Sequence, residues 1–139
     1  MLLKDMLALN EPLKNLCSKR LSSFRTARLL SKTLKKVEEE IEIYSKEQRK
    51  LLDTYAKKDE KGNFIPHPNG GISLIDAEAK VKYEEALKKL LETDVGMIAT
   101  IKVSESEFTN PADFPTPQEM VALEPLIDWD VTNEPDAKN

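Results

Sequence analysis

The stretch Ala27–Tyr55, ARLLSKTLKKVEEEIEIYSKEQRKLLDTY, decides the fold. Apolar or aromatic side chains recur in it at alternating steps of three and four residues, with a single polar exception. This spacing predicts one long helix with a narrow apolar seam, as in a coiled coil. A helix from Ser23 to Lys57 would be roughly 50 Å long, so it needs partners along its length. The predicted seam consists of Ala27, Leu30, Leu34, Val37, Ile41, Tyr44, Gln48, Leu51 and Tyr55.

One partner for the seam lies in the same chain. Asp76 is a good N-cap for the segment AEAKVKYEEALKKLLE, residues 77–92, which has an apolar stripe of its own. This second helix would be roughly 24 Å long and would pair with half of the first in an antiparallel helical hairpin. The other half must be covered by N-terminal helices, by the C-terminal segment, or by another copy of the chain.

The two ends of the chain supply further helices. Two short amphipathic helices are expected at the N-terminus, because Asn10 can cap a second helix that has Pro12 in its first turn. Near the C-terminus, Thr116, Pro117 and Glu119 have the spacing of a capping box. They predict a short C-terminal helix that docks on the hairpin.

A small antiparallel sheet is expected at one end of the hairpin. The segment VGMIATIKV, residues 95–103, alternates apolar side chains and is rich in β-branched residues, which predicts a strand. Its expected partners, NFI at 63–65 and ISLI at 72–75, flank a Pro-Asn-Gly-Gly turn. The sequence therefore predicts an α+β, mostly α, single domain over residues 1–130. Residues 131–139 are expected to form a disordered acidic tail.

The composition excludes several classes of protein. The single cysteine rules out an internal disulfide framework, and no apolar run approaches the roughly 20 residues needed to cross a bilayer. The opening MLLKDMLALN is too short and too soon charged to be a signal peptide. We therefore expect a soluble intracellular protein that has no membrane partner.

No motif predicts catalysis, a cofactor or a metal. Asp59 opens a segment that resembles a calcium loop, but Lys61 stands where an oxygen ligand is required and Gly62 comes too early, which indicates a turn. His67 has no second histidine, and Cys17 has no partner base. We expect a protein that is not an enzyme and that binds no cofactor.

The charge is unevenly distributed along the chain. The net charge is −4, yet residues 1–36 carry nine Lys or Arg against two acids. A row of cations on one side of the long helix could hold nucleic-acid phosphates, although no aromatic side chain interleaves with it for base stacking. The alternative is a solvated face, or one that meets the acidic tail. The row consists of Arg25, Arg28, Lys32, Lys35 and Lys36.

The apolar seam is the other candidate site. Because it is longer than its partner helix, we expect part of it to bind a protein partner or a second copy of the chain. The expected recognition surface consists of Leu30, Leu34, Val37 and Ile41.

Residues 23–95 resemble a family of small tailed-bacteriophage proteins that is catalogued as a domain of unknown function. The resemblance rests on the two predicted helices and on their junction, LLDTYAKKDEKGN, at residues 51–63. It implies a phage or prophage origin and a non-enzymatic role in protein interaction or assembly, as a virion or accessory component. A phage inhibitor of a host or defence protein is an alternative. The implied location is the cytoplasm of an infected bacterium, or the virion.

Overall fold

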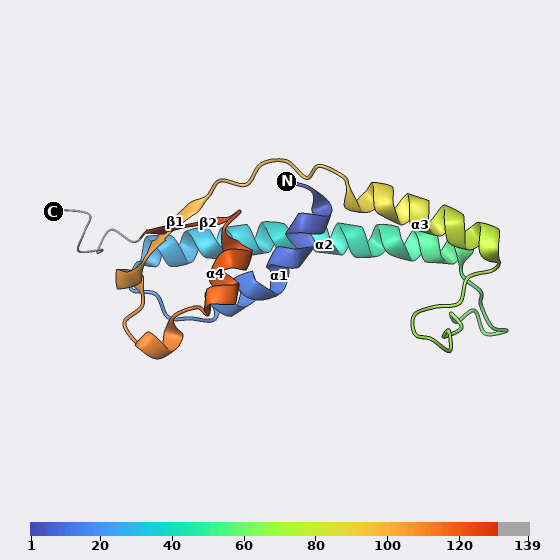
Figure 1. Cartoon of the computed structure of the whole chain (residues 1–139), viewed down its shortest axis with the longest axis horizontal. Coiled ribbons are helices and arrows are strands. Elements are labelled where there is room, and N and C mark those ends of the chain that lie inside the picture. Colours follow the sequence, from blue (N-terminus) through green and yellow to red (C-terminus); the bar gives the residue numbers. More distant parts are fainter. Residues whose placement is uncertain (131–139) are drawn as a thin grey trace.

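The helix α2, Phe24–Tyr55, forms the long axis of the molecule (Figure 1). The structure is a computed structural model, and it describes residues 1–130. As predicted, α2 begins at Ser23. The Ser23 hydroxyl caps the helix by accepting a hydrogen bond from the backbone N–H of Thr26 at 3.2 Å. Glu107 reinforces this end, because its carboxylate accepts from the Ser23 N–H and from the Thr26 hydroxyl, both at 3.0 Å. A negative charge is favourable at this end of a helix.

The predicted helical hairpin is present. Helix α3, Ala77–Leu91, packs antiparallel on the C-terminal half of α2, and Asp76 caps it by accepting from the Ala79 N–H at 2.7 Å. The connection between the two helices does not form a regular sheet. It holds isolated antiparallel bridges, such as the one between Lys58 and Phe64.

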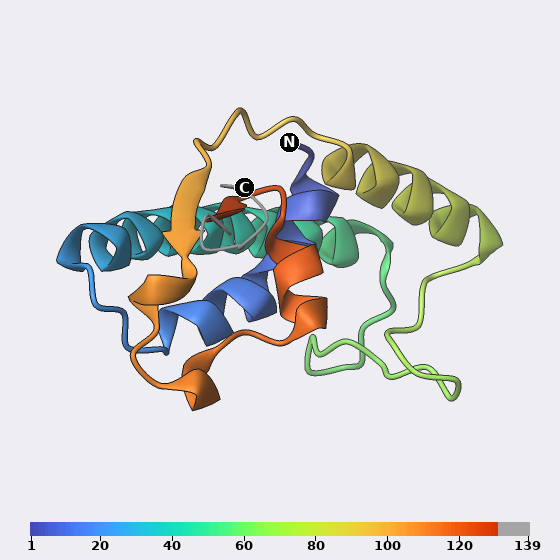
Figure 2. The ribbon, with the colours of Figure 1, turned by 60° about the vertical axis from the view of Figure 1, so that its left-hand side comes forward.

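The N-terminus forms one helix, α1, Leu3–Cys17, so the prediction of two short helices is wrong. Pro12 lies inside α1 and has no N–H to donate to the preceding turn, a defect that bends or breaks helices. Figure 2 shows that α1 bends where it crosses α2. The helix continues through the proline because its apolar side chains on both sides, including Leu9 and Leu13, lie in one core.

The sheet has two strands, β1, Ile101–Ser104, and β2, Ile127–Asp130. They are parallel, with Ile101 opposite Ile127, so the predicted antiparallel sheet is wrong. The segment between them contains two short 3₁₀ helices, η1, Glu105–Glu107, and η2, Pro111–Asp113, followed by α4, Pro117–Leu123. A connection of this length is what a parallel pair requires.

The position of the sheet also differs from the prediction. Both strands lie beside the N-terminal half of α2, while the connection between α2 and α3 lies at the opposite end of the molecule (Figure 1). The predicted strand over 95–103 is shortened to its last part, since Gly96 has a φ of 89° and the Met97 side chain is 95% exposed. The predicted capping box of α4 is confirmed, with Thr116 and Glu119 each accepting from the other's N–H.

The hydrophobic core lies around the N-terminal half of α2. The elements α1, α2, α4, β1 and β2 all contribute to it, and α4 packs on α1. The predicted acidic tail at 131–139 lies outside the described residues. The largest fully buried side chains are those of Met6, Leu13, Leu16, Leu30, Leu123, Leu126, Ile127, Val37 and Val103.

Candidate interaction surfaces

The four seam residues predicted as a recognition surface are buried or half-buried in the molecule. Leu30 and Val37 are 1% and 0% exposed, and Leu34 and Ile41 are half-buried against the same core. The prediction that they form an exposed surface is therefore wrong. The physical reason is that α1 and β1 pack on the N-terminal half of α2 and cover the seam there.

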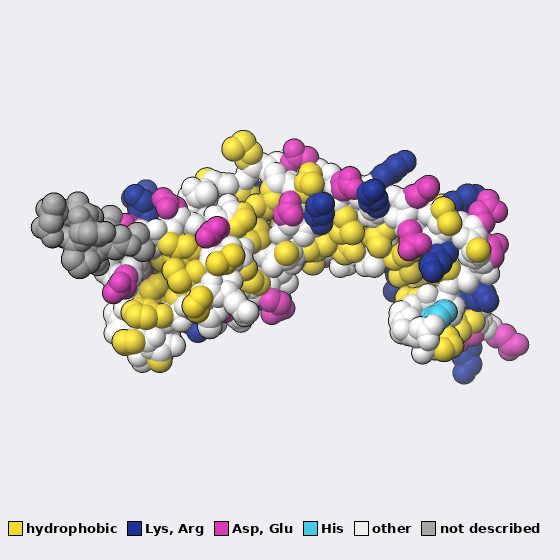
Figure 3. All heavy atoms as spheres, in the orientation of Figure 1, with side chains coloured by type: hydrophobic (Ala, Val, Ile, Leu, Met, Phe, Trp, Pro, Cys, Tyr) yellow, Lys and Arg dark blue, Asp and Glu magenta, His cyan; other side chains and the backbone are white. Residues whose placement is uncertain are grey.

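The C-terminal half of the seam is covered much less completely. We call residues 38–55 of α2 together with α3 the arm. Within α2 no residue after Val37 is fully buried, and in α3 only Ala79 is. Figure 3 shows hydrophobic atoms exposed along the line between these two helices. The half-buried apolar and aromatic side chains of the arm are those of Ile41, Tyr44, Leu51, Leu52, Tyr55, Tyr83, Ala86, Leu87, Leu90 and Leu91.

The two helices of the arm are joined by a polar contact within the seam. Gln48, the polar member of the predicted seam, donates from Nε2 to the Tyr83 hydroxyl at 3.3 Å. Burial, and to a smaller extent the neighbouring Tyr83, raise the pKa of Tyr44. These side chains are partly removed from water, although they are not enclosed.

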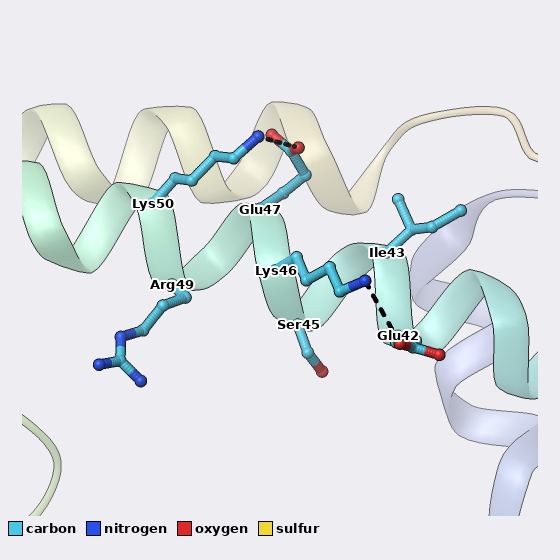
Figure 4. Close-up of a pocket in the computed structure, with 7 residues that line it drawn as sticks. All are labelled: Glu42, Ile43, Ser45, Lys46, Glu47, Arg49 and Lys50. Atoms are coloured by element: carbon cyan, nitrogen blue, oxygen red, sulfur yellow. Dashed lines mark hydrogen bonds and ion pairs between the residues drawn. The ribbon is translucent and has the colours of Figure 1, made fainter.

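An open hollow of about 640 Å³ lies on the outer side of the arm (Figure 4). Its lining side chains all come from one stretch of α2, residues 42–50, and Ile43 is the only apolar one among them. The ammonium groups are paired, Lys46 with Glu42 at 3.3 Å and Lys50 with Glu47 at 3.1 Å. The Glu42–Lys46 pair has the spacing of four residues that favours ion pairs on a helix. With its charges paired on a single helix, this hollow offers no converging groups for catalysis.

The predicted row of cations is exposed along the N-terminal half of α2. All five side chains are exposed, and within residues 1–130 none of them forms an ion pair. They share a face opposite the buried seam, since they recur at helical spacing and lie about half a turn around the helix from Leu30 and Val37. We call this surface, Arg25, Arg28, Lys32, Lys35 and Lys36, the basic face.

An exposed aromatic residue beside the basic face was not predicted from the sequence. Phe24 is the first residue of α2, and its side chain is 82% exposed. It stands one turn before Arg28, so the two side chains are neighbours on the helix surface. Its position directly after the N-cap Ser23 is the signal that could have revealed it. In a helix that begins there and has Leu30 and Val37 in its seam, Phe24 points away from the seam.

The residues considered as catalytic or metal-binding candidates do not come together in the structure. Cys17 is half-buried, and burial, followed by the charge of Glu38, raises the pKa of its thiol, which disfavours the reactive thiolate. His67 is exposed and accepts a hydrogen bond from the Asn69 N–H at 3.1 Å. The segment at Asp59 is a turn, as predicted, with Gly62 at a φ of 81°. No group of three acidic, histidine or cysteine side chains that could hold a metal ion occurs in residues 1–130.

A separate cavity of about 260 Å³ opens where the sheet meets α4 and the 3₁₀ helices. Phe108 and Phe114 meet edge to face in its wall, with ring centroids 5.7 Å apart. Trp129 also lines it and donates from Nε1 to the Met120 carbonyl at 3.0 Å. These rings fix the position of the segment 108–120 against β2.

A protein-family model described as a protein of unknown function (DUF1617) matches residues 3–110. The chain belongs to the DUF1617 family. No curated protein and no solved structure matches it. The stretch matched to DUF1617 contains the basic face and the whole arm, and it ends before η2, α4 and β2. Across residues 1–130, every helix is either too short or too polar to span a bilayer.

Proposed function

We propose that this chain is a non-catalytic assembly protein whose arm packs against the arm of a second copy. The supporting observation is the incomplete burial of the arm. Its apolar seam continues for about five helical turns beyond Val37, and α3 is the helix that packs along it. The connection between α2 and α3 adds contacts at the far end, where the Arg49 guanidinium lies over the Phe64 ring. Two helices bury only one stripe of each other, whereas four antiparallel helices enclose their apolar side chains in a common core.

The charges of the arm favour a second copy as the occupant. Residues 38–55 carry six acids and three bases, and α3 carries three acids and four bases. When two arms pack together, each therefore presents both acids and bases to the other. The N-terminal half of α2, in contrast, carries five bases and no acid between Phe24 and Val37, so two such halves would repel each other. A twofold pairing through the arms keeps the basic faces out of the interface.

The biological setting is proposed from the resemblance to tailed-phage proteins. An assembly protein of a phage or prophage would act in the cytoplasm of an infected bacterium or as a part of the virion. The same surface could instead hold a host or defence protein, as a phage inhibitor would. Self-association through the arm distinguishes these two roles, because an inhibitor needs its surface free for its target.

The oligomeric state tests this proposal. The two helices of the arm run side by side over the length of α3, about 22 Å, which offers an interface at the small end of the specific range. We therefore expect a dimer with a dissociation constant on the order of micromolar. Light scattering after size exclusion should show the mass rising toward that of a dimer as the concentration increases from about 1 to about 100 µM. The double variant Leu87→Gln, Leu91→Gln should stay a monomer, because these neighbours on α3 contribute half-buried apolar surface to the arm.

Ile43→Gln is the matched control. Ile43 is 54% exposed on the outer side of α2, away from the seam, so its substitution should leave the dimer unchanged. Circular dichroism must show that the double variant keeps its helices. A wild-type chain that remains a monomer at the highest concentration, or an equal loss of dimer in the Ile43 variant, would contradict the proposal.

A further inference from the structure

We infer that the basic face of α2, together with Phe24, binds single-stranded nucleic acid. This inference concerns a surface separate from the arm and does not depend on self-association. It rests on three observations: a row of exposed cations that form no ion pair within residues 1–130, an exposed aromatic ring at the end of the row, and a rigid helix that holds both.

The cations form a row at fixed spacing. From Arg25 to Lys36 the helix rises by about 16 Å, and the five cations recur at intervals of about 1.5 to 6 Å along that rise. The opposite side of this helix segment is fixed in the core by Leu30 and Val37. The row is therefore held straight before any ligand binds, which reduces the entropy lost on binding.

The acids closest along the chain do not neutralise the row. At the N-terminal end, the Glu107 carboxylate accepts the two hydrogen bonds from Ser23 and Thr26 described above. At the other end, the first acid of α2 is Glu38, after the last cation of the row. The net negative charge of the chain lies elsewhere, and salt screens it beyond about 10 Å at 0.1 M ionic strength.

Phe24 indicates which polyanion the face suits. A base can stack on an exposed aromatic ring while neighbouring cations hold the backbone phosphates, and this combination is typical of proteins that bind single strands. In a duplex the bases are already stacked on one another, so the ring would have no base to accept. A single strand uses both the ring and the cations.

A membrane surface fits the same helix less well. A helix that lies on anionic lipid buries an extended apolar face in the bilayer. The apolar face of α2 is inside the protein core, and beside the cations only Phe24 and Leu29, which is 41% exposed, remain for lipid. We therefore assign the face to nucleic acid and use lipid vesicles as an opposing probe.

The test is fluorescence anisotropy of the full chain with a labelled thymidine oligonucleotide of about 20 nucleotides. If about four phosphates are held, the affinity for a single strand should fall about 50-fold between about 50 and 200 mM salt. The triple variant Arg28→Gln, Lys32→Gln, Lys35→Gln should reduce the slope of log affinity against log salt by about 2. Phe24→Ala should weaken binding by about 5- to 150-fold, whereas Phe24→Tyr should retain it.

The arm supplies a matched control for the triple variant. Lys46, Arg49 and Lys50 lie on the same helix but are paired with acids, so replacing all three by Gln should leave the affinity and the salt slope unchanged. The inference is overturned by no binding at about 50 mM salt, or by equal effects of the two triple variants. It is also overturned if vesicles of equal parts phosphatidylserine and phosphatidylcholine compete fully with the oligonucleotide. A failure here leaves the dimer untouched, because neither Phe24 nor any cation of the basic face belongs to the arm.

Discussion

Leu30→Ala should lower the free energy of unfolding by about 2–5 kcal/mol, whereas Leu51→Ala should lower it by only about 1 kcal/mol. Both leucines belong to the seam that the sequence predicts on α2. Leu30 is 1% exposed within a core built from several elements, so its removal leaves a cavity. Leu51 is half-buried between two helices, so its removal loses less contact and the remaining gap is open to water.

Urea unfolding at low micromolar protein concentration measures this difference. The dependence of the free energy on urea should be the same for the wild type and both variants, which would show that the extent of unfolding has not changed. Losses of equal size for the two leucines would mean that the arm is as well enclosed as the first half of α2. The division of the seam into a buried half and an open half would then be wrong.

A chain that ends at Asn110, the last residue matched to the family, should fail to fold cooperatively. The missing part includes α4, β2 and the turn between them, which contribute Leu123, Ile127 and Leu126 at 0%, 2% and 0% exposure. Each fully buried aliphatic side chain contributes about 1.5–3 kcal/mol, so their loss removes about 4–9 kcal/mol from a total that is typically about 5–15 kcal/mol. The hydrogen bond from the Ile101 N–H to the Leu126 carbonyl, 2.9 Å long, is lost as well.

Thermal unfolding followed by circular dichroism provides the measurement. A chain that ends at Asp130 is the control, and it should melt in one cooperative transition. The chain that ends at Asn110 should show a broad, weak transition or none. If the two chains melt at the same temperature, the buried side chains after Asn110 are not needed for the stability of the core, which would contradict the account.

The helices could be predicted from the sequence because their signals are local. Ser23 and Asp76 begin helices where capping chemistry indicates, and Thr116 forms the predicted capping box. Strand pairing is not local, so alternation in residues 95–103 identified a strand but not its partner. The partner, β2, lies more than twenty residues later, after α4, and no local pattern links the two segments. The proline at position 12 was taken as a boundary, but burial on both sides of it outweighs the missing hydrogen bond.

For the candidate surfaces too, the sequence predicted what depends on local spacing and missed what depends on distant segments. The basic face follows from helical spacing alone and is exposed as predicted. The seam also follows from spacing, yet spacing cannot tell which half receives cover from distant segments. Leu30 and Val37 of the predicted surface are buried, because α1 and β1 cover them and no local pattern of the sequence shows that packing. Phe24 was missed because exposure of an aromatic residue at a helix end depends on the register of the whole helix.

Amide hydrogen exchange at two protein concentrations tests most directly whether half of the seam is closed by the chain itself and the other half by a second copy. At about 1 µM, amides in residues 41–55 and 79–91 should exchange faster than those in α1 and in residues 28–37 of α2. At about 100 µM, the arm should become protected while the other helices stay as they were. Arm amides that are as slow as those of the core at both concentrations would contradict the account.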